Sequence, residues 1–295
     1  MSLFAGSAWA EPASSFAPGW EDLSRRLAAE GFAPGYVRML FDRSAVVYDP
    51  GVMARKMDAL LETRLGRKAG EKVPVPHEER AELYDAYHTD PELLERAAAY
   101  MRSRAELLGR VEARSGVPRE VMTALLLVET RLGSITGTIR VFVNLASMAA
   151  SRDPGPVRGA MRNELPSEEG AWFLKRMNEK ADWAFKELAA LVRYARANGQ
   201  DPLSIRGSVY GAIGQCQFLP TSAEAYGVDG DDSGTVDLFT EADAVASIGN
   251  YLRHHGWTGK MTAERRYKAI FAYNRSKHYT QAILGLAERL AEEPR

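Results

Sequence analysis

A largely apolar run at residues 121–133 contains one carboxylate, Glu129, and its pattern indicates a buried helix. On a helix, the side chains three and four positions from Glu129 are those of Leu125, Leu126, Leu132 and Gly133. Burial disfavours the charged form of an acid, so we expect a raised pKa for Glu129 and a proton donor of the kind that glycosidases use. Gly133 would let a ligand come close to this acid. The alternative is a glutamate at the edge of a buried helix, paired with Arg131 or another cation.

Helical periodicity dominates the remaining chain, and strand signals are scarce. With 295 residues, of which 45% are hydrophobic and 26% charged, the chain can bury a large core as one elaborated domain or two intimate ones. A formal net charge of −1 gives no electrostatic reason to expect nucleic acid or an anionic membrane as a partner. The single cysteine, Cys216, excludes an intramolecular disulfide framework, and the histidines show no zinc-ligand spacing.

Apolar spacing, together with proline and glycine at the ends of segments, places the expected helices. They cover residues 20–31, begin at Pro50, Pro76, Pro91 (running toward Gly116) and Pro118, and cover residues 167–198, 243–255, 263–273 and 279–290. Residues 66–77 and 151–156 contain several glycines or prolines, and we expect breaks there.

The first ten residues resemble the end of a secretory signal peptide. Ala8-Trp9-Ala10 has the small-x-small form of a cleavage site, although the basic segment that should precede it is absent. We therefore expect residues 1–10 to be a truncated signal remnant, and the alternative is the unstructured N-terminus of a cytoplasmic protein. No apolar run approaches the roughly 20 residues needed to span a bilayer.

Two further segments combine small, polar and aromatic residues. In residues 206–222, three glycines suit a backbone that approaches a ligand closely, while Ser208 and Gln217 offer hydrogen bonds. Residues 273–279 place Tyr273, Asn274 and Tyr279 around an expected helix break, which suits a sugar site of aromatic faces and polar edges. The alternatives are a packed helix crossing for the first segment and a solvated loop for the second.

Taken together, these motifs resemble the membrane-bound lytic transglycosylase B family. The matching segments, in order and at matching spacing, are Val128-Glu129-Thr130-Arg131 with Gly133, Gly207-Ser208, Gly211-Ala212-Ile213-Gly214, residues 217–222, Asn250-Tyr251-Leu252, His255-Gly256-Trp257, Tyr273-Asn274, Ser276 and His278-Tyr279. The resemblance is continuous from about Asp90 to Leu290 and weak before that. Several motifs agree at once, which makes the resemblance specific.

The resemblance implies a mainly α, lysozyme-like transglycosylase core with an additional helical subdomain and at most a small β-hairpin. It implies an N-terminal helical region at 11–89 and a catalytic region at 90–295. Glu129 would be the catalytic acid, and the saccharide groove would be lined by Ser208, Gln217, Tyr273, Asn274 and Tyr279. The expected partner is the glycan strand of peptidoglycan, cleaved at the β-1,4 bond between N-acetylmuramic acid and N-acetylglucosamine. The family's lipid-bearing N-terminal cysteine is missing, so we expect a soluble periplasmic form.

The chemistry expected at Glu129 needs no cofactor. Most glycosidases use two carboxylates, but the motifs around Glu129 offer only serine, glutamine, tyrosine and asparagine. One acid would then act twice, first protonating the leaving oxygen and then deprotonating the muramic 6-hydroxyl, which gives a 1,6-anhydro product. A water-using muramidase and an inactive peptidoglycan-binding scaffold remain alternatives.

Residues 229–237 have the alternating oxygen pattern that opens an EF-hand loop. Thr240 stands at the twelfth position, where a bidentate glutamate is expected. The resemblance implies a longer loop closed by Asp243, and hence a structural Ca²⁺ or Na⁺ site. Its ligands would come from Asp229, Asp231, Ser233, Thr235, Asp237 and Asp243. A polar loop with Asx turns and no metal is the alternative.

Overall fold

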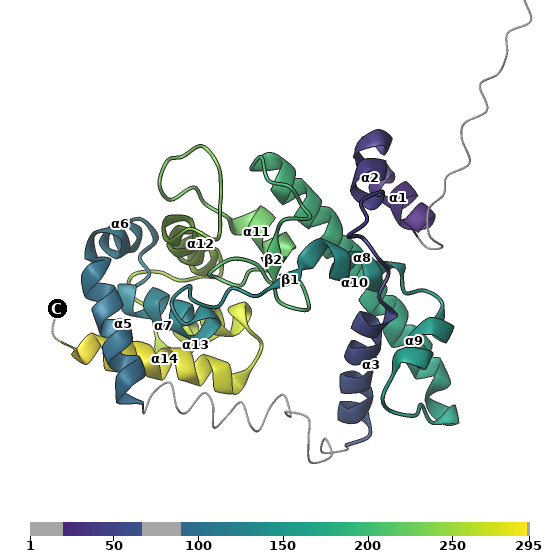
Figure 1. Ribbon diagram of the computed structural model, residues 1–295. Coiled ribbons are helices and arrows are strands. Elements are labelled where there is room, and N and C mark those ends of the chain that lie inside the picture. The colour runs from purple at the N-terminus through teal and green to yellow at the C-terminus, as the bar shows by residue number, and fades with distance from the viewer. Residues whose placement is uncertain (1–19, 67–89, 294–295) are drawn as a thin grey trace, which may run out of the picture. The chain divides into compact units, whose positions relative to one another are not determined.

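The structure, a computed structural model, describes residues 20–66 and 90–293 (Figure 1). Its internal contacts divide the chain into two compact units, one ending at Val47 and one beginning at Tyr48. The expected signal remnant, the helix expected from Pro76 and the boundary expected near residue 89 all lie outside the described residues. Those three expectations stay predictions.

The first unit contains α1 (Trp20–Ala29) and α2 (Pro34–Phe41), which pack against each other. The ring centroids of Trp20 and Phe41 lie 5.2 Å apart, and Leu23 and Leu27 on α1 are buried. The predicted amphipathic helix that begins at Trp20 is therefore present, with its apolar face turned toward α2.

Helices make up nearly all of the regular structure of the second unit, as predicted. They are α3 (Pro50–Arg64), α5 (Pro91–Ser103), α6 (Ala105–Ser115), α7 (Arg119–Thr130), α8 (Val141–Ala150), α9 (Pro154–Ala160), the short 3₁₀ helix η1 (Ser167–Glu169), α10 (Gly170–Ala197), α11 (Pro220–Tyr226), α12 (Glu241–His254), α13 (Ala263–Tyr273) and α14 (Lys277–Glu292). Among the described residues, no helix is both long enough and apolar enough to cross a membrane.

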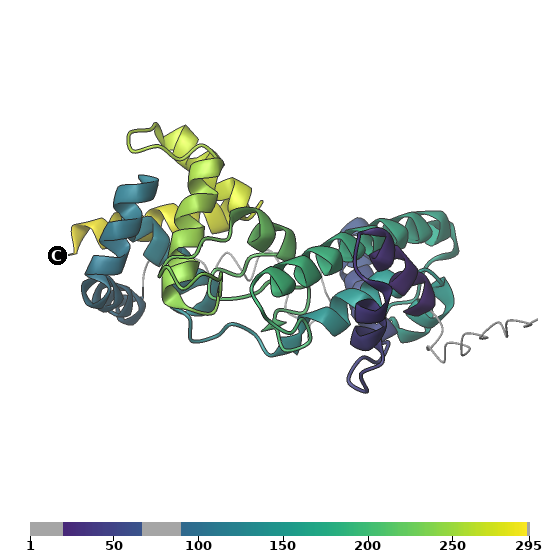
Figure 2. The ribbon, with the colours of Figure 1, turned by 90° about the horizontal axis from the view of Figure 1, so that it is seen from above.

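Helix α7 occupies the middle of one helical group, because it packs against α5, α6, α12 and α14 (Figure 1). Nine of its twelve residues are buried, including Leu125 and Leu126. In a second group, the long helix α10 packs along α8 and also meets α3 and α11 (Figures 1 and 2). The burial of α7 on nearly all sides follows from its almost uninterrupted apolar sequence.

The β structure of the described chain is as small as expected, but its two strands are distant in sequence. Strand β1 (Ile139–Arg140) pairs antiparallel with β2 (Arg206–Gly207), with Ile139 opposite Gly207. This pair ties the segment after α7 to the segment that carries Ser208 and Gln217.

Among the helix boundaries that differ from the prediction, two lie at Arg104 and at Pro154. The long helix expected from Pro91 breaks at Arg104, where α5 ends and α6 begins; both helices pack on α7, but α5 also packs on α14 whereas α6 packs on α12. The break expected at 151–156 is shorter than predicted, because Asp153 caps a helix that begins at Pro154. Proline at the first helical position starts that helix and does not interrupt one.

Candidate active site

Glu129 lies in the last turn of α7, which ends sooner than predicted. Arg131 and Leu132 adopt left-handed conformations, with φ of 50° and 61°, so the chain leaves the helix after Thr130. The expectation that Leu132 and Gly133 share a helical face with Glu129 is therefore wrong. Among the expected neighbours, only Leu125 and Leu126 lie on α7 itself.

Gly133 makes room for a protein side chain. Its φ is +84°, and a Cβ atom placed there would lie 2.6 Å from Oε1 of Gln215. The space expected to admit a ligand at this glycine thus contains Gln215. A side chain at residue 133 would have to displace that buried glutamine.

The carboxyl group of Glu129 accepts a hydrogen bond from a tyrosine that is distant in sequence. The hydroxyl of Tyr279 donates to Oε1 of Glu129 over 2.6 Å, and Tyr279 is only 1% exposed. Tyr279 lies in the first turn of α14, whose N-cap is the hydroxyl of Ser276, and α14 packs on α7. The two helices thereby fix the orientation of the Glu129 carboxyl group. Its expected raised pKa stays a prediction.

Tyr273 and Cys216 complete this cluster. The hydroxyl of Tyr273 donates to the backbone oxygen of Cys216 over 2.5 Å. Burial raises the pKa of Tyr273 well above its ordinary value, and the nearby Cys216 and Glu129 raise it further. Burial also raises the pKa of the Cys216 thiol to about 12, with a smaller contribution from Glu129. Around Glu129, the described chain therefore supplies neutral hydroxyl and thiol groups.

Ser208 and Gln217 both hold their own segment in place. Oγ of Ser208 accepts from the backbone N–H of Ala212 over 3.0 Å. The side-chain amide of Gln217 donates to the backbone oxygens of Thr136 and Gly214 over 3.1 and 3.0 Å. Gln217 also has a left-handed φ of 49°, which is uncommon outside glycine. Whether these two side chains also bind a sugar stays a prediction.

The glycines of this segment serve close packing of the backbone. Gly214 has φ +70°, and a Cβ atom there would lie 2.4 Å from the backbone oxygen of Leu238.

The helix break expected near Asn274 is present, since α13 ends at Tyr273 and Asn274 has an extended backbone. Asn274 is partly exposed, between the two tyrosines of the cluster in sequence.

Gln215 and Thr130 are two further residues of the site: Thr130 stood in the family motif without an assigned role, and Gln215 was not predicted. Oγ1 of Thr130 donates to the backbone oxygen of Gln215 over 2.9 Å and accepts from the N–H of Gly133 over 3.0 Å. The side-chain amide of Gln215 donates to the oxygen of Phe239 over 2.8 Å. These bonds connect the end of α7 with residues 214–218 and 238–239. Their only sequence signal is a pair of polar residues in an apolar setting.

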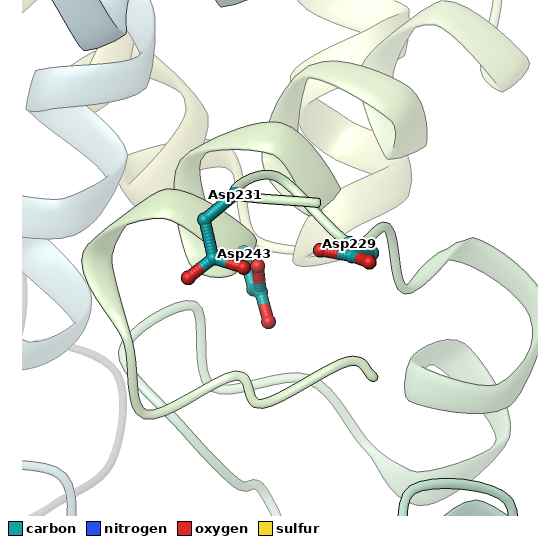
Figure 3. A group of neighbouring side chains, drawn as sticks. All are labelled: Asp229, Asp231 and Asp243. Atoms are coloured by element: carbon teal, nitrogen blue, oxygen red, sulfur yellow. The ribbon is translucent and has the colours of Figure 1, made fainter. Parts of the chain in front are cut away.

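A second site lies in residues 229–243, which we call the aspartate loop. The structure brings the carboxylates of Asp229, Asp231 and Asp243 within 4.8 Å of one another (Figure 3). Asp243 is 1% exposed, and burial is the main cause of its raised pKa, with Asp231 and Asp229 adding to it. Three clustered carboxylates form a set of hard oxygen donors that suits Ca²⁺.

The other predicted ligands lie differently in the loop. The carboxylate of Asp237 accepts from the N–H of Phe239 over 3.0 Å and lies outside the group of three. The hydroxyl of Ser233 donates to the backbone oxygen of Thr235 over 3.1 Å. Thr240, at the twelfth position, is the N-cap of α12, and its hydroxyl accepts from the backbone N–H of Asp243. Among the described residues, the three clustered carboxylates, together with other oxygen atoms of the loop, thus form a ligand set that suits a cation.

The fold agrees with those of solved lytic transglycosylases. A structure of Escherichia coli SLT35 in complex with calcium is 20% identical, with a TM-score of 0.67 and coverage of 93% of each chain. A structure of SltB3 from Pseudomonas aeruginosa in complex with NAG-anhNAM-pentapeptide is 21% identical, with a TM-score of 0.68 and coverage of 94% of this chain and 79% of the other. These similarities define a lysozyme-like lytic transglycosylase fold.

The chain belongs to the family described as the transglycosylase SLT domain, whose sequence model matches residues 15–266. The membrane-bound lytic murein transglycosylase B of Escherichia coli (strain K12) is 28% identical over 167 residues, which are 57% of this chain and 39% of that protein. The chain thus spans about two fifths of the length of this relative. The family resemblance drawn from the motifs is confirmed.

Proposed function

We propose that this protein is a lytic transglycosylase that cleaves the β-1,4 bond between N-acetylmuramic acid and N-acetylglucosamine in peptidoglycan. The observation that carries the proposal is the Glu129 carboxyl group, held by Tyr279 among neutral groups. The charge of Glu129 contributes to the raised pKa of Tyr273 and to that of Cys216. Among the described groups that act on these two side chains, Glu129 is the one carboxylate. Membership of the transglycosylase family supports the same reaction.

The proposed mechanism uses Glu129 twice. Its carboxyl proton passes to the glycosidic oxygen as the bond from that oxygen to C1 breaks. The resulting carboxylate accepts the proton of the muramic 6-hydroxyl, whose oxygen forms the new bond to C1. No water is consumed, and Glu129 ends protonated again. The Tyr279 hydroxyl stabilises the intermediate carboxylate through a charge-assisted hydrogen bond.

The substrate would lie along the segments that carry the other predicted residues. Ser208, Gln217 and Asn274 would hydrogen-bond the acetamido groups, and Tyr273 would contribute an aromatic surface. The SltB3 ligand, NAG-anhNAM-pentapeptide, supports both an anhydro sugar and a peptide-bearing strand as ligands here. We place the reaction in the periplasm, with the peptidoglycan strand as partner.

The aspartate loop would bind Ca²⁺ as a structural ion. The calcium in the SLT35 structure supports this assignment, as does the cluster of Asp229, Asp231 and Asp243. The ion would neutralise three close carboxylates and hold the loop. The proposed proton transfers at Glu129 need no cofactor.

The mass of the products tests the proposed reaction. Purified sacculi digested with the protein should yield muropeptides with 1,6-anhydro ends. Products heavier by one water would identify a muramidase. No soluble product, with retained binding to sacculi, would identify a peptidoglycan-binding scaffold.

A further inference from the structure

Outside the Glu129 site, Lys56 and Lys180 form a cationic cluster that adjoins the segment carrying Ser208. Nζ of Lys56, on α3, lies 4.4 Å from the centre of the Tyr210 ring. Tyr210 follows Ser208 by two residues, and the side-chain amide of Asn144 fixes the intervening Val209 by donating to its backbone oxygen over 3.0 Å. Lys56 and Tyr210 are both partly exposed, so a ligand can reach them.

A second lysine faces Lys56 from α10. At the far end of these two helices, the guanidinium of Arg64 on α3 lies 5.1 Å from the Trp172 ring on α10. The step from Lys56 to Arg64 along α3 equals the step from Lys180 back to Trp172 along α10, so antiparallel packing from the Arg64–Trp172 contact would bring the two lysines opposite each other. Burial lowers the pKa of Lys56, and the charge of Lys180 lowers it further.

The two lysines lack an anionic partner within the part of the chain that the structure describes. Within the described chain, Lys56 and Lys180 form no ion pair with a carboxylate. The neighbouring Arg55 is paired with Asp49 at 3.7 Å. A half-buried cation beside a like charge is destabilising, and a ring face offsets only part of that effect. An anion bound between the lysines would relieve both the burial and the repulsion.

We propose that Lys56, Lys180 and the face of Tyr210 form a subsite for a carboxylate of the peptide stem on the glycan strand. The inference rests on the proposed function, because the strand held near Ser208 would carry the stem. The adjacent glycan is neutral at its acetamido groups, whereas the stem supplies free carboxylates. The subsite would therefore distinguish strands by the state of their peptides.

The test compares two ligands of nearly the same shape, one with charged peptide carboxylates and one with neutral amides in their place. A tetrasaccharide of alternating N-acetylglucosamine and N-acetylmuramic acid, bearing pentapeptides, is prepared with free peptide carboxylates and with the same carboxylates converted to amides. Affinities are measured by calorimetry with the Glu129→Gln form, which should bind without cleaving. Lys56→Met and Lys180→Met are introduced into that form, and Lys175→Met, an exposed lysine of the same helix α10, is the control.

We expect Lys56→Met and Lys180→Met each to weaken binding of the carboxylate ligand by about 3- to 10-fold and to leave the amide ligand unchanged. Lys175→Met should change neither affinity. The melting temperature of Lys56→Met should stay the same or rise, since an unpaired half-buried charge is removed. Equal losses for both ligands, or no loss for either, would overturn the subsite. If neither ligand binds the Glu129→Gln form, the proposed function fails, and the subsite fails with it.

Discussion

The Glu129 site and the aspartate loop use carboxylates in opposite ways. At Glu129, a single carboxyl group lies among the neutral groups of Tyr279, Tyr273 and Cys216. In the aspartate loop, three carboxylates lie within 4.8 Å of one another. A lone acid can gain and lose a proton without disturbing a neighbouring charge, whereas clustered acids repel one another until a cation or protons neutralise them.

The two regions also differ in how their acids are held. Glu129 is held by a hydroxyl group from a helix 150 residues further along the chain. The loop carboxylates accept mainly from nearby backbone N–H groups: Gly234 donates to Asp229 over 2.7 Å, and Gly230 to Asp243 over 2.8 Å. The site for proton transfer thus depends on the packing of α7 against α14, and the proposed metal site depends on a local turn.

Glu129→Gln should have the largest effect on turnover. The amide retains size and hydrogen bonding but has no transferable proton, so we expect a loss of roughly 100-fold or more on purified sacculi. Glu120→Gln, at a buried carboxyl group in the first turn of the same helix, is the matched control and should retain activity. A Glu129→Gln protein with wild-type rates would remove Glu129 from the mechanism.

Gln217→Ala should have the next largest effect. Loss of the side chain leaves polar partners unsatisfied, so we expect a cost of about 1–3 kcal/mol in binding or transition-state stabilisation. Alanine also inherits the left-handed φ of 49° and loses the bonds to Thr136 and Gly214, so the melting temperature should fall. Gln217→Gly removes the same side chain while tolerating that φ.

The pair of variants separates the two contributions. If the side chain binds sugar, both variants should lose similar affinity for muropeptides, and glycine should be the more stable of the two. Unchanged rate and affinity in a folded Gln217→Gly protein would limit Gln217 to holding its loop.

Tyr279→Phe tests how the lone acid is held. The ring and its packing remain, while the 2.6 Å bond to Glu129 is lost, and we expect turnover to fall by about 10-fold. The basic limb of the pH–rate profile, where Glu129 loses the proton that it must donate, should move to higher pH, since the carboxylate form loses a hydrogen-bond donor. Tyr267→Phe, on α13, is the control because its ring stacks on Phe271 without a hydroxyl bond to a described residue. A profile that stays in place would show that Tyr279 only packs.

The sequence predicted the elements that depend on local pattern. The helix expected at residues 263–273 is α13 (Ala263–Tyr273), and Asp229 and Asp231 lie together as their alternation indicates, whereas Asp243 was implied only by the family resemblance. The end of α7 could not be predicted, because Arg131 and Leu132 are ordinary residues in conformations imposed by packing. The family resemblance predicted that Tyr279 and Glu129 belong to the same site, but it did not predict the hydrogen bond between them. No local spacing relates residues so far apart in the sequence.

The same reason explains why Gln215 was missed. Its side chain reaches Phe239, its backbone oxygen accepts from Thr130, and its Oε1 has no hydrogen-bond partner among the described residues. None of these features follows from hydrophobic periodicity, which indicates only that residue 215 lies among small residues. Bonds between distant segments are fixed by tertiary packing and have no period in the sequence.

Ca²⁺ should have the smallest effect on turnover and a clear effect on stability, in contrast to the Glu129 variants. An ion that binds only the folded state at ten times its Kd stabilises it by about 1.4 kcal/mol, which should raise the melting temperature by about 2–3 °C. Asp243→Asn should abolish the increment. Asp232→Asn, in the same loop but outside the group of three, should keep it, because asparagine tolerates the left-handed φ of 59° found there.

The increment should also depend on pH in a defined direction. Burial raises the pKa of Asp243, so in chelator the free energy of unfolding should fall as the pH rises through that pKa. Ca²⁺ requires the carboxylate form, so its stabilisation should grow over the same interval. Melting curves with millimolar Ca²⁺ and with chelator, recorded on both sides of this interval, measure the difference. Identical curves at every pH would make the aspartate loop a turn held by its own backbone bonds, and the contrast with the Glu129 site would then be one of geometry alone.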